Sequence, residues 1–282
     1  MYASSTVLDL KFLYGLCCTT DRNFKSTVLV SLLALVPLPT LLPLQAAAMV
    51  GGAPPAPPAI ASHAVLIVGS RGNSCTGVAL ARDLVLTVAH CVQPGADYKL
   101  VDYDTARRPQ LRDIRSIAVH PQFDLPTMLA HRMTADVALL KLAEPLPADK
   151  SPAILGSRLP TTVGESFVVA GFGVTVRGDG RTGGTVRSAT LVATGRPGSL
   201  QLRLVDPATR NDSAGLSACT GDSGAPVFEE SDGKLRVIGV VSWSTGPKNT
   251  GGCGGLTGVT PLARYRDWIV DTARKLGSPL SP

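Results

Sequence analysis

The segment Cys219–Val227 constrains the fold of this chain more than any other stretch of its sequence. It reads Cys-Thr-Gly-Asp-Ser-Gly-Ala-Pro-Val, which places Ser223 between two glycines, Gly221 and Gly224. Glycines on both sides allow a tight turn with positive φ and let a substrate approach the backbone. Such a turn can point successive backbone N–H groups at one position, as an oxyanion hole requires. The segment therefore predicts a nucleophilic serine on a tight loop that a sheet supports.

A serine is a weak nucleophile unless a base accepts its proton and a third group orients that base. The predicted base is His90, in Thr-Val-Ala-His-Cys, and the predicted orienting acid is Asp136, in Thr-Ala-Asp-Val-Ala-Leu-Leu. His131 is the strongest competitor for the base, because it lies near Asp136 in the sequence. The order His, Asp, Ser differs from that of the α/β-hydrolases, which runs Ser, acid, His around a Gly-x-Ser-x-Gly motif.

With these three motifs in this order, residues 49–269 resemble the trypsin/chymotrypsin-like serine proteases. The resemblance implies that Ser223 attacks a peptide carbonyl, His90 transfers the proton and Asp136 orients the imidazole; the template for this mechanism comes from that family. It also implies that the backbone N–H groups of Gly221 and Ser223 bind the oxyanion. The chain is thus expected to be a serine endopeptidase with a polypeptide substrate, no cofactor and a protein inhibitor as a possible further partner.

The same resemblance implies a set of substrate-binding residues. They are Ser217 at the base of the specificity pocket, Ser244 and Gly258 in its walls, and Ser242 with Trp243 at the edge that pairs with substrate backbone. A neutral serine at the base argues against strong specificity for Arg or Lys, and we expect a medium-sized apolar residue before the scissile bond. The alternative is that these are ordinary loop residues near a pocket of unknown depth.

Residues 1–48 are predicted to be a secretory signal peptide. Lys25 precedes an apolar run, and the run ends in Gln-Ala-Ala-Ala at positions 45–48, the small residues of a cleavage site. An uncleaved membrane anchor is the alternative, but three prolines keep the run below the roughly 20 residues that a spanning helix needs. We therefore expect export to the extracellular space or a periplasm, without stable membrane insertion after cleavage.

Cleavage after residue 48 would start the mature chain with Met-Val-Gly-Gly, which resembles the Ile-Val-Gly-Gly start of the family. There the new α-ammonium pairs with the acid before the catalytic serine, so the implied activation pair is Met49 and Asp222. The hypothesis is that signal peptidase itself creates the active terminus. The alternative interpretation of Val-Gly-Gly is a flexible linker before the proline-rich residues 53–58.

The chain has six cysteines, which suit an oxidising compartment. Two lie in the predicted signal peptide, and the other four allow three pairings. The family resemblance implies the pairs Cys75–Cys91 and Cys219–Cys253. A zinc site is the alternative use of these side chains, but the sequence offers no Cys-x₂-Cys motif and no pair of histidines at ligand spacing, so we expect no metal.

The composition favours an all-β fold, because 29 glycines and 22 prolines accompany few helical periods. Short aliphatic or β-branched runs separated by turn residues predict antiparallel barrels or a sandwich. The runs cover 64–68, 77–80, 84–88, 114–119, 137–142, 166–173, 185–192, 200–204, 226–228 and 237–243. The resemblance implies two packed six-stranded antiparallel β-barrels (chymotrypsin-like), about 49–142 and 150–260, within one domain of residues 49–282. Periodic apolar residues predict a C-terminal helix over 261–276.

The net charge of +6 is spread along the chain without a block of Lys or Arg, so we expect no nucleic-acid partner. A non-catalytic secreted binding module on the same scaffold is the alternative from another functional class. Such a module usually lacks a triad member, whereas this sequence keeps all three. An esterase is the nearer alternative, because the same triad hydrolyses esters.

Overall fold

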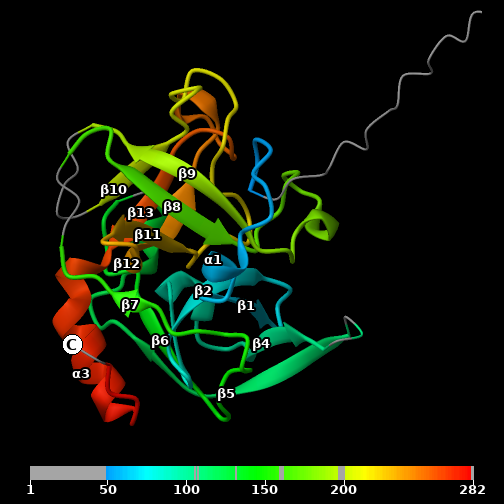
Figure 1. Ribbon diagram of the computed structural model, residues 1–282, viewed down its shortest axis with the longest axis vertical. Coiled ribbons are helices and arrows are strands. Elements are labelled where there is room, and N and C mark those ends of the chain that lie inside the picture. Colours follow the sequence, from blue (N-terminus) through cyan, green and yellow to red (C-terminus); the bar gives the residue numbers. More distant parts are fainter. Residues whose placement is uncertain are drawn as a thin grey trace, which may run out of the picture. The chain divides into compact units, whose positions relative to one another are not determined.

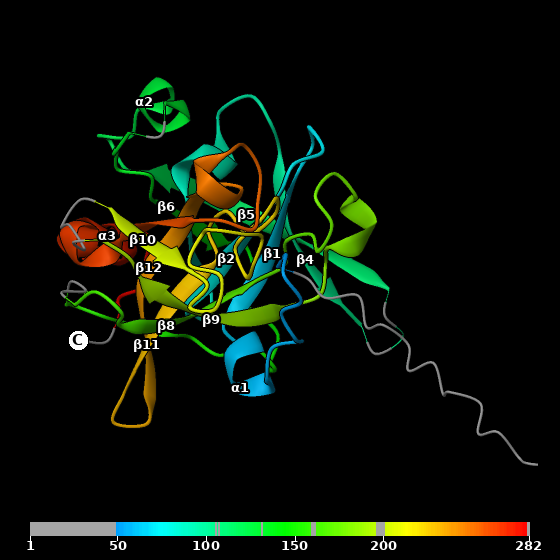
Figure 2. The same ribbon diagram turned by 90° about the horizontal axis from the view of Figure 1, so that it is seen from above.

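The computed structural model describes residues 49–104, 106, 108–130, 132–158, 162–195 and 201–280. The predicted signal peptide and His131 lie outside the described residues. Two closed six-stranded antiparallel barrels and a C-terminal helix make up the described part, as Figures 1 and 2 show from two directions. The all-β, chymotrypsin-like fold class predicted from the sequence is confirmed.

The first barrel has the closed strand order β1-β2-β3-β6-β5-β4. Its strands are β1 (Ala64–Gly69), β2 (Ser74–Ala81), β3 (Leu84–Thr87), β4 (Tyr98–Tyr103), β5 (Pro109–Val119) and β6 (Ala138–Leu142). Aliphatic side chains on β2, β3 and β6 fill its interior. Because β3 pairs with β6 through Thr87 and Ala138, the segment after β3 and the segment before β6 meet at one end of the barrel.

The second barrel has the order β11-β8-β9-β10-β13-β12 and is closed by pairing of β11 with β12. Its strands are β8 (Ser166–Gly171), β9 (Arg187–Ala193), β10 (Leu202–Val205), β11 (Pro226–Ser231), β12 (Lys234–Ser244) and β13 (Thr257–Pro261). A two-residue strand, β7 (Ile154–Leu155), pairs in parallel with β12. The segment between β10 and β11 carries Ser223.

Three α-helices and four 3₁₀ turns complete the described elements. They are α1 (Pro58–Ala61), η1 (Ala89–Val92), α2 (Leu125–Leu129), η2 (Gly180–Thr182), η3 (Pro247–Asn249), η4 (Leu262–Tyr265) and α3 (Arg266–Lys275). The predicted C-terminal helix is therefore present, with its first turn in the tighter 3₁₀ form. Ile269 and Ala273 on α3 are buried against a core cluster that also holds residues of both barrels, so the helix packs onto the barrels rather than standing apart.

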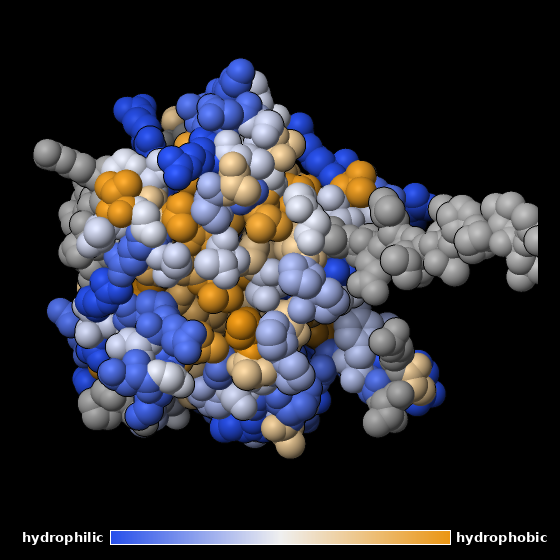
Figure 3. Space-filling view, turned by 45° about the horizontal axis from the view of Figure 1, so that its top comes forward, coloured by the Kyte–Doolittle hydropathy of each residue, from blue (hydrophilic) through white to orange (hydrophobic). Residues whose placement is uncertain are grey.

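On the face that Figure 3 shows, apolar residues gather between hydrophilic ones. The most exposed large hydrophobic side chains among the described residues are Leu111 on β5, Leu129 on α2, and Val163 and Val176 in two separate loops. Within the described residues, no helix is long and apolar enough to cross a membrane.

Candidate active site

The loop that carries Ser223 is held by both barrels. Thr76 on β2 donates its N–H to the Ser223 carbonyl over 2.8 Å, and its hydroxyl donates to the Gly221 carbonyl over 2.8 Å. From the second barrel, the carbonyl of Val241 accepts the Gly224 N–H over 2.7 Å. These bonds fix the backbone on both sides of the serine, which is half-buried.

Glycine is required beside the serine for steric reasons. Gly221 and Gly224 have φ values of 96° and 83°, in the left-handed region that side chains rarely adopt. A Cβ at position 224 would lie 2.1 Å from the Thr76 carbonyl oxygen, which the strand holds in place. The turn requires glycine on both sides of the serine because of its positive φ values, and the close approach of β2 leaves no room for a side chain at position 224.

Asp222 points away from the cavity and into the protein. Its carboxylate accepts hydrogen bonds from the backbone N–H groups of Gly173, over 2.8 Å, and Cys219, over 2.9 Å. The residue is completely buried. Burial raises the pKa of Asp222 to about 7, although the two backbone donors oppose that shift. Met49, the other member of the predicted activation pair, is also fully buried, in the core cluster of the second barrel.

His90 and Asp136 meet where β3 ends and β6 begins. The distance from His90 Nδ1 to Asp136 Oδ2 is 2.8 Å, and the His90 backbone N–H donates to Asp136 Oδ1 over 3.0 Å. The Asp136 side chain is 1% exposed, so this carboxylate is shielded from water. With Nδ1–H donated to the carboxylate, Nε2 of the neutral imidazole is an acceptor.

Ser242 adds a third donor to the same carboxylate. Its hydroxyl lies 2.5 Å from Asp136 Oδ2. The sequence assigned Ser242 to the edge that pairs with substrate backbone; the structure in addition places its side chain on Asp136. This contact spans 106 positions of sequence, and no local pattern could have indicated it.

His90 and Ser223 line one cavity of about 340 Å³, called here the His90–Ser223 cavity. Its lining also includes Gly221, Trp243 and Ser244, three further residues that the sequence assigned to the site. The remaining wall is largely uncharged and comes from Asn73, Ser74, Cys75, Cys91, Ala218, Cys219, Thr220 and Val241. A concave site that unites a serine, an imidazole and a loop of backbone N–H groups can support nucleophilic acyl transfer.

Two residues assigned to the specificity pocket do not line this cavity. Ser217 is fully buried, and its hydroxyl donates to the Ala218 carbonyl over 3.0 Å and accepts the Gly254 N–H over 2.6 Å. Gly258 lies against the ring of Trp243, where an added Cβ would come within 2.0 Å of the indole. Both positions thus support the wall of the cavity from behind.

Two disulfides join the pairs that the resemblance implies, Cys75–Cys91 and Cys219–Cys253. The first links β2 to η1 next to His90, and the second links the loop that carries Ser223 to the segment after β12. Each such bridge contributes about 2–4 kcal/mol in typical proteins. Among the described residues, no group of three or more His, Cys, Asp or Glu side chains is placed to hold a metal ion.

Comparisons with known proteins agree on one family. The family model for trypsin matches residues 49–269. Trypsin from Phaedon cochleariae is 27% identical over 69% of this chain and 77% of its own length, and the vitellin-degrading protease of Bombyx mori is 28% identical over 77% and 82%. Vitamin K-dependent protein C of Mus musculus is 30% identical over 73% of this chain and 48% of its own length. The chain therefore belongs to the trypsin family and is a serine-type endopeptidase.

Proposed function

We propose that this protein is a secreted endopeptidase that uses Ser223 as nucleophile, His90 as general base and Asp136 as the group that orients His90. The observation that carries the proposal is the 2.8 Å contact between Asp136 and His90 at the wall of the cavity that Ser223 also lines. The contact leaves Nε2 as the acceptor that a serine hydroxyl needs. The family membership supports the same assignment.

The proposed mechanism is nucleophilic acyl transfer in two stages. Ser223 Oγ attacks the peptide carbonyl while its proton passes to His90 Nε2, and the imidazolium that results is stabilised by the buried Asp136 carboxylate. The backbone N–H groups of Gly221 and Ser223 bind the oxyanion, each such donor contributing about 2.7–4 kcal/mol to the transition state. The peptide C–N bond then breaks as the imidazolium of His90 gives its proton to the departing amine, which leaves an acyl-enzyme ester. His90 next takes a proton from a water molecule that attacks this ester, and the ester C–O bond breaks as the proton returns to Ser223 Oγ.

The proposed substrate specificity is for an uncharged, medium-sized apolar residue before the scissile bond. The His90–Ser223 cavity has an apolar wall, which is formed by Ala218, Val241 and Trp243. Ser217, behind that wall, carries no charge, and backbone groups occupy its hydroxyl. An Arg or Lys side chain would therefore find no carboxylate there.

The proposed activation step is removal of residues 1–48. The buried Asp222 carboxylate has two N–H donors but no cation among the described residues. An α-ammonium at Met49 would supply that cation, and Met49 is already buried in the same barrel. The proposal places processing during export, with signal peptidase as the enzyme that creates the terminus.

Labelling of the secreted protein with a fluorophosphonate, beside a Ser223→Ala variant, tests the proposal. We expect rapid labelling of a chain whose first residue is Met49, and none in the variant. The same preparations are assayed on matched peptide and ester substrates that carry Leu or Lys before the scissile bond. A correctly processed chain that is neither labelled nor active would point to a non-catalytic binding module, and hydrolysis of esters alone would point to an esterase.

A further inference from the structure

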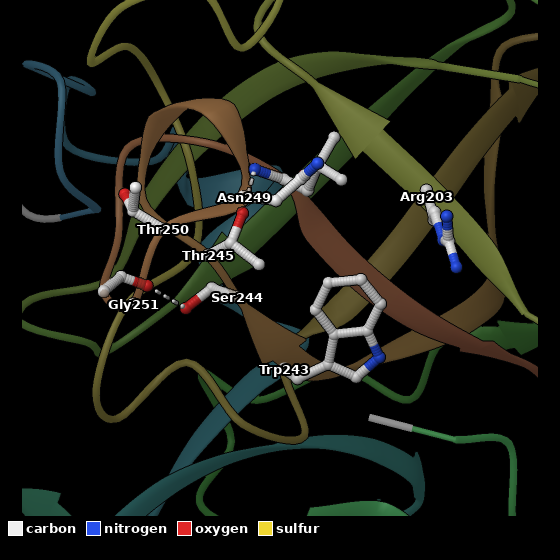
Figure 4. Close-up of a pocket in the computed structure, with 9 residues that line it drawn as sticks. Arg203, Trp243, Ser244, Thr245, Asn249, Thr250 and Gly251 are labelled. Atoms are coloured by element: carbon white, nitrogen blue, oxygen red, sulfur yellow. Dashed lines mark hydrogen bonds between the residues drawn. The ribbon is translucent and has the colours of Figure 1, made fainter. Parts of the chain in front are cut away.

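A second cavity, of about 410 Å³, adjoins the His90–Ser223 cavity. Trp243 and Ser244 line both, so these two residues form the wall between them. The segment after β12 supplies most of the remaining lining, and Arg203 on β10 supplies the rest. Figure 4 shows Arg203 and the indole of Trp243 on one side of this Trp243–Arg203 cavity, with Thr245 and Gly251 opposite.

The sheet explains why Arg203 lies beside this tryptophan. Arg203 on β10 pairs with Gly258 on β13, and Gly258 pairs with Trp243 on β12. Residues in one such row project to the same face of a sheet. Because Gly258 has no side chain, the indole lies over it, and Arg203 Cζ is 6.0 Å from the ring centroid. That is the separation of a cation–π pair.

The cavity is positively charged. Arg203 is the one ionisable residue in its lining, and no aspartate or glutamate accompanies it. The Arg203 side chain is exposed, and within the described part of the chain no hydrogen bond or ion pair engages its guanidinium. Arg177 adds a second guanidinium at the rim, where it donates to the Gly251 carbonyl over 3.3 Å. A ligand group that complements this cavity is an anion.

The unpaired edge of β12 connects the two cavities, because Trp243 and Ser244 line both of them. Pairing with β11 ends at Val240, whereas pairing with β13 continues to Ser244, so residues 242–244 have one edge without a strand partner in the described structure. A peptide can add to such an edge as a further strand. Ser242 contacts Asp136, and the path along β12 toward Ser244 leads away from the triad.

Both β11 and β13 pair antiparallel with β12, and we place the substrate in the same direction. In a peptide antiparallel to β12, residues farther along β12 face residues that come earlier in the substrate. Successive residues rise about 3.3 Å and alternate in side-chain direction. The Trp243–Arg203 cavity thus faces the third or fourth residue before the scissile bond, while the scissile carbonyl lies at Ser223.

We propose that Arg203 is a specificity-determining residue that selects an acidic side chain at the third or fourth position before the scissile bond. This inference rests on the proposed peptidase function. The guanidinium stays oriented by the indole, and a substrate carboxylate would pair with it across the cavity, where the Trp243–Ser244 wall shields part of the pair from water. Partly shielded pairs are stronger than fully exposed ones.

Fluorogenic peptides with one fixed residue before the scissile bond, and Glu, Gln or Lys at the third or fourth position, test the inference. We expect the wild-type kcat/KM to be about three- to tenfold higher for the Glu peptide than for the Lys peptide. This ratio should be smaller in 0.5 M salt, because salt screens the interaction between charges. Arg203→Glu should invert this order and Arg203→Gln should abolish it. Lys234→Glu, the same charge change at the opposite end of β12, should leave it unchanged.

The fluorophosphonate labelling rate identifies variants whose site is intact; if Arg203→Glu does not label, Arg203→Gln carries the test. The inference is overturned if the intact variants rank the peptides as the wild type does, or if the wild type shows no preference while it cleaves them. In both cases the peptidase function itself still stands. Failure of the wild type to cleave any peptide would overturn the proposed function and the inference together.

Discussion

Ser242 donates to a carboxylate that two groups of His90 already engage, so Asp136 accepts three hydrogen bonds while shielded from water. Hydrogen bonds to a charged group contribute about 1.5–3 kcal/mol. We therefore expect Ser242→Ala to lower kcat at least tenfold, because Asp136 and the imidazole lose orientation, with a smaller effect on KM. Steady-state kinetics on one apolar peptide measures the change. Ser242→Thr keeps the hydroxyl and is the control, and an unchanged kcat in Ser242→Ala would contradict the role.

Gly224 can be compared with another glycine of similar backbone conformation. Gly224 and Gly233 have φ values of 83° and 68°, but a Cβ at 224 would meet the Thr76 carbonyl, whereas a Cβ at 233 has nothing within 4 Å. Gly233→Ala should cost about 1 kcal/mol, the strain of a left-handed alanine. Gly224→Ala should cost several times more and abolish fluorophosphonate labelling. Chemical denaturation of both variants measures the difference, and equal losses of stability would refute the steric argument.

At the scale of elements, β1 and β6 could be predicted because each includes a run of at least three consecutive aliphatic residues. The prediction missed β4, where Lys99 and Asp102 interrupt the apolar residues, and β13, where a glycine and a proline stand among five residues. The tight turn around Ser223, with positive φ at Gly221 and Gly224, is encoded locally and could be predicted. The positions of Ser217 and Gly258 behind the cavity wall depend on strand pairing, which no single segment encodes.

The Cys75–Cys91 disulfide ties η1, which carries His90, to β2, which holds the serine loop. Replacing both cysteines by alanine should lower the free energy of unfolding by about 2–4 kcal/mol. We also expect a lower fluorophosphonate labelling rate, because His90 loses its covalent support. Cys219→Ala with Cys253→Ala is the matched comparison, which should have a similar cost in stability. A double variant at 75 and 91 with wild-type stability would contradict a structural role for this bridge.

At the scale of the whole molecule, the site depends on both barrels. His90 and Asp136 come from the first, Ser223 comes from the second, and Thr76 joins the two by bonds to the serine loop. C-terminal residues such as Tyr265 and Ile269 pack in the same core cluster as residues of both barrels. The geometry of three side chains is thus a property of the complete fold. Because Asp222 is fully buried, the stability of the fold also depends on the charge of this residue.

The pKa of Asp222 is raised from 3.8 to about 7 by burial, so the folded chain binds a proton that the unfolded chain releases at lower pH. The contribution of Asp222 to the free energy of unfolding is present in full below pH 4 and is lost as the pH rises through 7. The total loss is about 4 kcal/mol at most. An α-ammonium at Met49 would pair with the carboxylate, lower its pKa and remove this loss.

Two chains that carry Ser223→Ala allow the comparison, one starting at Met49 and one with a single additional residue before it. Between pH 4 and pH 7 we expect the unfolding free energy of the extended chain to fall relative to that of the chain with a free Met49. Buried His120, whose pKa is lowered by desolvation, also makes stability depend on pH, but it is common to both chains and cancels in the difference. Parallel pH profiles would mean that the Met49 terminus does not pair with Asp222, and that activation needs another cation or a different terminus.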